Sequence, residues 1–125
     1  ETQIAPERTF CLLSEIAGLE KQGLIKGGNL GNAVIIVDKE IDDEEVSFFK
    51  KRFGIKFYVG NRGLYKSQIL RFKNEPVRHK TLDLLGDLAL LGKPILGHVT
   101  AIKSGHKGNV EFAKLLREEF KDQFK

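Results

Sequence analysis

One predicted helix carries three side chains whose types and spacing suit chemistry. His79, Asp83 and Asp87 follow one another at intervals of four residues, so on a helix they share one face. An imidazole nitrogen and a carboxylate oxygen one turn apart can both reach one zinc ion at about 2 Å each. His and Asp four apart form an ordinary polar pair more often, however. The row therefore indicates either a metal site or such a pair.

A second polar segment covers residues 103–109 and contains another imidazole. His106 lies between a predicted strand and a predicted helix, at a loop edge from which it could reach a cleft. The plainer interpretation is a loop with exposed His and Lys side chains ahead of a helix, and catalytic sites are rare enough to favour it. The segment alone leaves both interpretations open.

The helix that must position the first row is predicted over residues 76–91. Proline suits the first turn of a helix, and Gly92 and Pro94 are stop signals. We expect the polar row to lie beside the buried edge of this helix, because an apolar stripe runs next to it at Leu82, Leu85 and Ala89.

The remaining elements alternate between strands and helices. Strands are predicted at 8–13, 33–37, 55–59, 69–72 and 94–103, and helices at 14–20, 42–49 and 109–120. Ser14 and Asp42 or Asp43 are predicted N-caps, and Gly23 and Gly54 are predicted helix ends. The pattern predicts one α+β domain over residues 1–125, a two-layer sandwich of a mixed sheet packed on helices.

Composition narrows the class of protein. The absence of Met, and a first residue that already approaches a strand, predict a piece of a longer chain. No apolar run approaches the length of a membrane span, and no secretory signal is evident, so we expect a protein of the cytoplasm. The single Cys11 agrees with a reducing compartment. The net charge of +4 suits an anionic partner, and a small basic RNA-binding domain is the alternative function to test.

Four segments together resemble one enzyme family. HKTLDLLGDLALLGKPILGH at 79–98 and KSGHKGN at 103–109 closely resemble the signature of the UDP-3-O-acyl-N-acetylglucosamine deacetylases. IAPERTF at 4–10 and GLIKGGNLGNAVIIVD at 23–38 resemble that family too. Only about residues 39–66 look unfamiliar, because they are longer than the connection expected there. The resemblance implies the C-terminal domain of such an enzyme.

The resemblance implies a zinc site that this chain holds only in part. His79 and Asp83 match two of the three protein ligands of a catalytic zinc ion. The third ligand, a histidine, and the glutamate that acts as general base lie in the family's N-terminal domain, which is absent here. We therefore expect this piece to bind metal weakly and to hydrolyse little or nothing. His98 does not match a ligand and is interpreted as structural.

Further roles are implied by the matching positions. His106 matches the general acid that protonates the leaving amine, Asp87 the carboxylate that orients it, and Thr9 the residue whose hydroxyl helps zinc to stabilise the oxyanion. Contacts with the substrate at the UDP diphosphate are implied for Lys80 and Lys103, and on the same side for Asn109.

The resemblance also implies a place for the substrate's acyl chain. In the family, an inserted strand-helix-strand unit, here about residues 14–37, forms a hydrophobic passage. The residues matching this passage are Ile16, Ile25, Gly28 and Ala33, with Phe10 bordering its entry. Leu12 stands where some relatives carry an aromatic residue near the nucleotide.

The activity that the resemblance implies is a step of lipid A synthesis in Gram-negative bacteria. The enzyme removes acetate from UDP-3-O-(3-hydroxyacyl)-N-acetylglucosamine, and in some bacteria it is fused to a hydroxyacyl-carrier-protein dehydratase. The expected partners are this substrate and the missing N-terminal domain, with no nucleic acid and no membrane span.

Overall fold

The computed structural model describes residues 2–54, 56, 63–65 and 68–124. The chain divides into two compact units, one of Glu1–Glu7 with Asn74–Lys125 and the other of Arg8–Lys73. The single domain over 1–125 and the inserted unit at about 14–37 stay predictions. None of the helices in the described part of the chain has the length and apolar content needed to span a bilayer.

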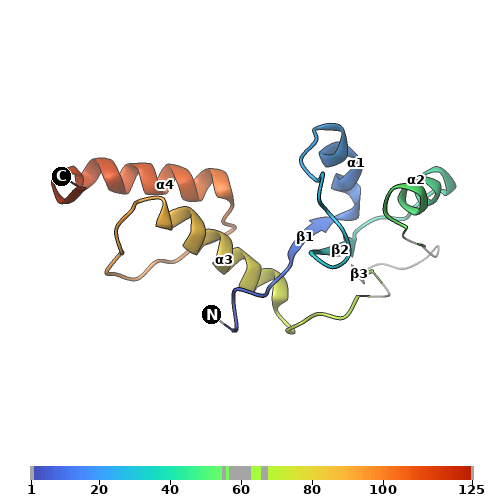
Figure 1. Ribbon diagram of the computed structural model, residues 1–125, viewed down its shortest axis with the longest axis horizontal. Coiled ribbons are helices and arrows are strands. Elements are labelled where there is room, and N and C mark those ends of the chain that lie inside the picture. Colours follow the sequence, from blue (N-terminus) through green and yellow to red (C-terminus); the bar gives the residue numbers. More distant parts are fainter. Residues whose placement is uncertain (1, 55, 57–62, 66–67, 125) are drawn as a thin grey trace. The chain divides into compact units, whose positions relative to one another are not determined.

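A small mixed sheet forms the centre of the unit Arg8–Lys73 (Figure 1). Strands β1 (Thr9–Leu12), β2 (Ala33–Val37) and β3 (Gly63–Leu64) lie in the order β1-β2-β3. β1 pairs with β2 in parallel, with Thr9 opposite Ala33, whereas β3 is antiparallel to β2. Helices accompany this mixed sheet, so the predicted α+β class is confirmed.

Two helices belong to this unit, α1 (Leu13–Lys21) and α2 (Asp43–Phe53). Of the two predicted caps of α2, Asp42 takes the position, since its side chain accepts a hydrogen bond of 2.8 Å from the Glu45 backbone N–H. Gly54 ends α2 in the left-handed conformation, with φ of 67°, which glycine adopts without strain. Gly23 similarly follows the end of α1.

The predicted cap of α1 was wrong. The helix begins at Leu13, and Leu12 rather than Ser14 occupies the cap position. Ser14 instead donates its hydroxyl to Asp38 Oδ2 at 2.6 Å, and its backbone N–H donates to Oδ1 of the same carboxylate at 3.1 Å. A distant carboxylate thus takes the place of the expected local cap.

The core of this unit joins the sheet to both helices. Apolar side chains of α1, β2 and α2 form it together with Tyr65: Leu13, Ile16, Ile35, Val37 and Phe49. No strand forms at 69–72, contrary to prediction. The side-chain amide of Gln68 instead forms hydrogen bonds with the backbone of β2. It accepts one of 2.8 Å from Ile35 N and donates one of 2.7 Å to Ala33 O. The predicted strand 55–59 lies outside the described residues except for residue 56.

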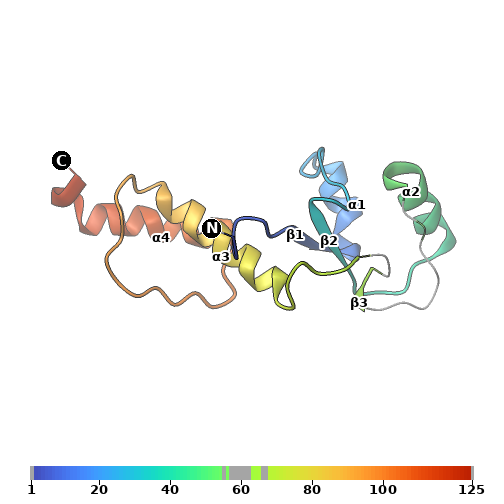
Figure 2. The same cartoon turned by 60° about the horizontal axis from the view of Figure 1, so that its bottom comes forward.

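The other unit is built on two helices that run alongside each other in the same direction (Figures 1 and 2). They are α3 (Glu75–Ala89) and α4 (His106–Glu119), followed by the short 3₁₀ helix η1 (Lys121–Phe124). Their shared core consists of Leu88, Leu91 and Ala113, with Leu84, Leu116 and Phe124 packed around it. Proline near the start of α3 agrees with the prediction.

The buried side of α3 differs from the predicted stripe. Leu85 is 58% exposed and Ala89 is also exposed, whereas Leu84 packs on the core and Leu88 is buried within it. Both stripes flank the polar row at helical spacing, so periodicity cannot choose between them. The packing of α4 decides the matter.

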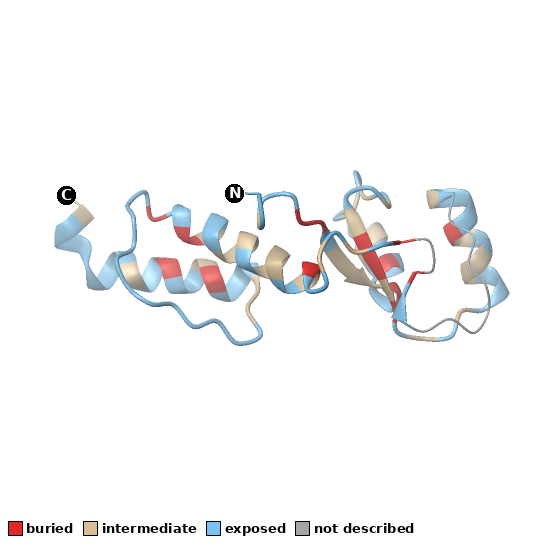
Figure 3. Ribbon diagram, turned by 90° about the horizontal axis from the view of Figure 1, so that it is seen from below, coloured by how far each residue is buried: buried red, intermediate tan, exposed pale blue. Residues whose placement is uncertain are grey.

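The strand predicted at 94–103 does not form. Every residue from 92 to 103 is exposed, and the loop after α3 is coloured as exposed in Figure 3. A strand gains its stability by pairing, and the described part of this unit contains no strand that could pair with it. Branched apolar residues alone therefore do not order this segment as a strand.

Candidate active site

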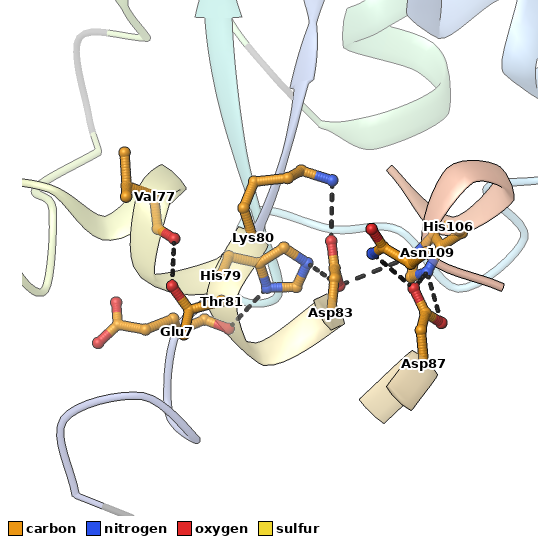
Figure 4. Close-up of polar contacts among 9 residues, drawn as sticks. All are labelled: Glu7, Val77, His79, Lys80, Thr81, Asp83, Asp87, His106 and Asn109. Atoms are coloured by element: carbon orange, nitrogen blue, oxygen red, sulfur yellow. Dashed lines mark hydrogen bonds and ion pairs between the residues drawn. The ribbon is translucent and has the colours of Figure 1, made fainter. Parts of the chain in front are cut away.

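Asp83 is the centre of the polar row on α3 (Figure 4). Its Oδ1 atom lies 3.2 Å from His79 Nε2, one helical turn away. Its Oδ2 atom accepts a hydrogen bond of 2.8 Å from Lys80 Nζ. The helix therefore presents an imidazole and a carboxylate toward one point, as the spacing predicted, and a lysine neutralises part of the negative charge.

The other nitrogen of His79 has a backbone partner. Nδ1 lies 3.3 Å from the carbonyl oxygen of Glu7, which can only accept a hydrogen bond. The Nδ1–H form of the ring satisfies this carbonyl and leaves the lone pair of Nε2 directed toward the Asp83 carboxylate. Two acceptors this close require a proton or a metal ion between them. The contact with Glu7 is therefore the kind that orients a metal-binding histidine.

His106 brings a second imidazole to the same carboxylate. It is the first residue of α4, and its Nε2 lies 3.7 Å from Asp83 Oδ1. Its Nδ1 lies 2.9 and 3.1 Å from the two oxygens of Asp87. The side chain is 67% exposed, so a solute can reach it. The structure thus brings His106 next to both carboxylates of the row on α3.

Asp87 of α3 contacts two side chains of α4, His106 and Asn109. Asn109, only 5% exposed, donates its side-chain N–H to Asp87 Oδ2 at 2.9 Å. Burial acts to raise the pKa of the Asp87 carboxyl group. Hydrogen bonds from Asn109 and His106, together with nearby positive charge, outweigh burial and hold this pKa below its ordinary value.

Helix packing explains why these groups meet. Leu88, the neighbour of Asp87, is buried against Ala113 of α4. The small alanine side chain lets the two helices approach closely, and the first turn of α4 then lies beside the polar row. The apolar contact of α3 with α4 thus positions His106 and Asn109.

A cavity of about 730 Å³ opens beside this cluster. Its walls are Leu84, residues 98–109 and Phe112. They include the predicted substrate residues Lys103 and Asn109 as well as His106. Lys103 has a φ of 51°, the left-handed region that non-glycine residues rarely adopt, and this conformation turns the chain toward α4. The volume falls within the range of ordinary small-molecule sites.

The remaining predicted residues lie in the unit Arg8–Lys73. Thr9 is exposed at the start of β1, and Phe10 follows it half-buried. All four residues predicted for the acyl passage line one cavity of about 40 Å³: Ile16, Ile25, Gly28 and Ala33. A side chain at Gly28 would press on the Ile25 carbonyl oxygen, because its Cβ would lie 3.3 Å away.

The described residues hold no cluster of three or more His, Cys, Asp or Glu side chains that could bind a metal ion. What they offer is the pair His79 and Asp83.

Comparison with known proteins identifies the family. The family model described as LpxC, UDP-3-O-acyl N-acetylglycosamine deacetylase, matches residues 1–53 and 56–118. The chain belongs to this family. Within residues 39–66, the stretch that looked unfamiliar, the match is interrupted only at 54–55.

Relatives of the family cover nearly all of the chain. It is 46% identical over 119 residues to the Bifunctional enzyme LpxC/FabZ of Chlorobaculum tepidum, covering 93% of this chain and 26% of that enzyme. It is 43% identical over 116 residues to the UDP-3-O-acyl-N-acetylglucosamine deacetylase of Chlamydia muridarum, covering 93% of this chain and 32% of that protein. The chain thus spans about a quarter to a third of these relatives.

Sequence reasoning missed some contributors to these sites. Glu7 acts through its backbone carbonyl, which no residue type signals. Cys11, Ile35 and Phe53 also line the apolar cavity. The alternation of β1 and β2 could have suggested the first two, since they lie opposite each other in the parallel pair. Nothing local in α2 marks Phe53 as a wall of that cavity.

Proposed function

We propose that this chain is the C-terminal part of a zinc-dependent deacetylase of lipid A synthesis. Its substrate is UDP-3-O-(3-hydroxyacyl)-N-acetylglucosamine, from which it removes acetate. Membership of the LpxC family supports this proposal. The observation that carries it is the position of one Asp83 oxygen 3.2 Å from His79 and 3.7 Å from His106.

The residues present fit a zinc ion in part. His79 Nε2 and Asp83 Oδ1 are both acceptors, and a cation between them would remove their mutual repulsion. The contact of His79 with the Glu7 carbonyl would keep the Nε2 lone pair free for the metal. A third protein ligand and a general base must come from the N-terminal part of the enzyme, so we expect the chain alone to bind zinc weakly.

When bound, zinc supplies an activated water and polarises the acetamide carbonyl. The contribution of this chain is the delivery of a proton. Asp87 contacts Nδ1 of His106. Nε2, which lies toward Asp83, is therefore the nitrogen that would face the reacting group. Amide hydrolysis has to protonate the leaving amine, and His106 Nε2–H would donate that proton. Asn109 fixes the Asp87 carboxylate and thereby the direction of the imidazole.

Roles for the other residues follow from the family resemblance. Lys103 would attract the diphosphate of the substrate from the wall of the 730 Å³ cavity. Lys80 would do so while also neutralising Asp83. Thr9 would stabilise the oxyanion with its hydroxyl, and the apolar cavity of the other unit would take the acyl chain. Action in the cytoplasm likewise stays a prediction.

The proposal is tested by mixing this chain with the complementary N-terminal part of the enzyme. Bound zinc and acetate release should both appear on mixing, and neither part alone should show more than a trace. Robust hydrolysis by this chain alone would contradict the proposal that the third zinc ligand and the general base come from the N-terminal part. RNA binding that weakens steeply with salt and ignores zinc would favour the alternative function.

Variants of the mixed enzyme separate the two imidazoles. His79→Ala should remove most of the bound zinc. His106→Ala should keep zinc but lower kcat about 10²-fold or more, the contribution typical of a general acid. Thr81→Ala is the matched control on α3, because its hydroxyl reaches only the Val77 carbonyl at 3.1 Å. Equal effects of His106→Ala on zinc content and on kcat would refute its role.

A further inference from the structure

The apolar cavity of the unit Arg8–Lys73 has a wall that neither the resemblance nor the spacing indicated. It is lined by Cys11 of β1, Ile16 of α1, Ile35 and Ala33 of the sheet, the loop residues Ile25 and 28–30, and Phe53. Phe53 is the last residue of α2 and the one lining residue from that helix. α2 lies within 39–66, the stretch that looked unfamiliar in the sequence, and the family model matches every residue of this helix.

We propose that Phe53 limits the length of the acyl chain that this cavity accepts. The inference rests on the proposed function and deepens it. The cavity of about 40 Å³ has little more room than one water molecule, whose share of liquid volume is about 30 Å³. A long acyl chain exceeds that space, so the side chains around the cavity determine how many methylene groups can enter.

Phe53 is held firmly enough to act as such a wall. Its ring stacks on Phe49 with centroids 6.2 Å apart and planes at 28°. Phe49 is itself only 1% exposed, within the core of the unit. Phe48 meets the Phe53 ring edge-on, also at 6.2 Å. Two aromatic neighbours, one of them fully buried, therefore fix the position of the ring.

A polar link ties the same end of α2 to α1. The Arg52 guanidinium carbon lies 4.8 Å from the centre of the Phe53 ring. Arg52 Nε also donates to Glu20 Oε1 at 2.6 Å, and Glu20 belongs to α1, the helix that contributes Ile16 to the cavity. The two helices that face the cavity are thus joined beside it, which keeps Phe53 from swinging away freely.

The chemistry of the lining suits a hydrocarbon chain. Apart from Asn29, every lining side chain is apolar or a glycine, and burial raises the pKa of the Cys11 thiol, which therefore stays neutral. Such a wall offers a ligand no charge and few hydrogen bonds. Each further methylene group that can be buried should tighten binding roughly fourfold. The affinity for an acyl chain should therefore rise with its length until Phe53 blocks the entry of further methylene groups.

The test uses saturated 3-hydroxy fatty acids of increasing length. Their binding to this 125-residue chain is measured by calorimetry for wild type, Phe53→Ala and Phe53→Leu. Wild-type affinity should level off at a certain length. Phe53→Ala should move that limit upward by two or more methylene groups, which is a gain of about 15-fold or more for the longer acids. Phe53→Leu, which keeps the core apolar, should shift it less.

Phe120→Ala is the control, since this phenylalanine is 47% exposed and does not line the cavity. The control should leave the length limit of wild type unchanged. Equal profiles for Phe53→Ala and Phe120→Ala, or the absence of saturable binding by wild type, would overturn the inference. Circular dichroism of each variant confirms that the unit remains folded.

A second measurement separates this inference from the proposed function. The mixed enzyme is given UDP substrates that carry the same acyl series, and acetate release is followed. If wild type hydrolyses them but Phe53→Ala keeps the same length preference, the role of Phe53 fails and the deacetylase stands. If binding shows the Phe53-dependent limit but no substrate is hydrolysed, the proposed function fails and the acyl cavity stands.

Discussion

At the scale of single residues, Asp87 connects the stability of the helix pair with the candidate chemistry. Its carboxylate accepts from Asn109 and lies within 3.1 Å of His106 through both oxygens. The pKa of this carboxyl group is lower in the folded chain than its ordinary value. A group of this kind contributes stability above its unfolded pKa and loses it as the pH falls through the folded pKa.

We therefore expect Asp87→Ala to lower the free energy of unfolding near neutral pH by about 1–2 kcal/mol, a value reduced by the exposure of the imidazole. The difference from wild type should shrink below about pH 4, the ordinary range of a carboxyl group, as the wild-type carboxylate becomes protonated. Urea unfolding of both proteins at several pH values measures this. A difference that stays constant into strong acid would show that the charge of Asp87 is not the source of the stability.

At the scale of elements, the helix ends depend on particular local contacts. The Asp42 carboxylate satisfies the backbone N–H of Glu45, which would otherwise lack a partner within the helix. Asp43 lies next to it in the first turn of α2, so both side chains meet the positive end of the same helix. The two residues differ in that the cap contact with the Glu45 N–H is made by Asp42.

Asp42→Ala should cost about 1 kcal/mol of stability in α2, as the loss of an N-cap typically does. Amide hydrogen exchange should accelerate in the first turn of the helix, at Glu45 above all. Asp43→Ala is the control, and it should cost only a few tenths of a kcal/mol, the typical effect of a charge near a helix end. Equal acceleration by both substitutions would assign the effect to charge rather than to capping.

At the scale of the whole molecule, the two hydrophobic clusters share no residue. One joins the sheet to α1 and α2, and the other joins α3 to α4. Small cores of this size leave little margin of stability. A substitution that disrupts one cluster should therefore destabilise its own unit first.

Phe49→Ala tests this, because truncation of a buried phenylalanine costs about 3–5 kcal/mol. Amides of β1, β2 and α2 should lose protection from hydrogen exchange, while those of α3 and α4 keep it. Phe120→Ala is the control, since that ring is 47% exposed and should affect exchange little. Simultaneous loss of protection in both units would mean that the chain unfolds as one cooperative body.

The sequence by itself determined the row of His79, Asp83 and Asp87 on one helix, the helix ends at Gly23 and Gly54, and a cap of α2 at Asp42 or Asp43. These local features depend on residues at most a few positions apart, where spacing dictates geometry. The family was also evident from the sequence, through four separate segments of the chain. Only the tertiary structure decided which side of α3 is buried, that 94–103 forms no strand, and that Ser14 turns to Asp38. It also revealed the Glu7 carbonyl against His79, 72 residues away, and Phe53 at the acyl cavity. Such contacts arise from packing between distant segments, and no pattern within either segment encodes its partner.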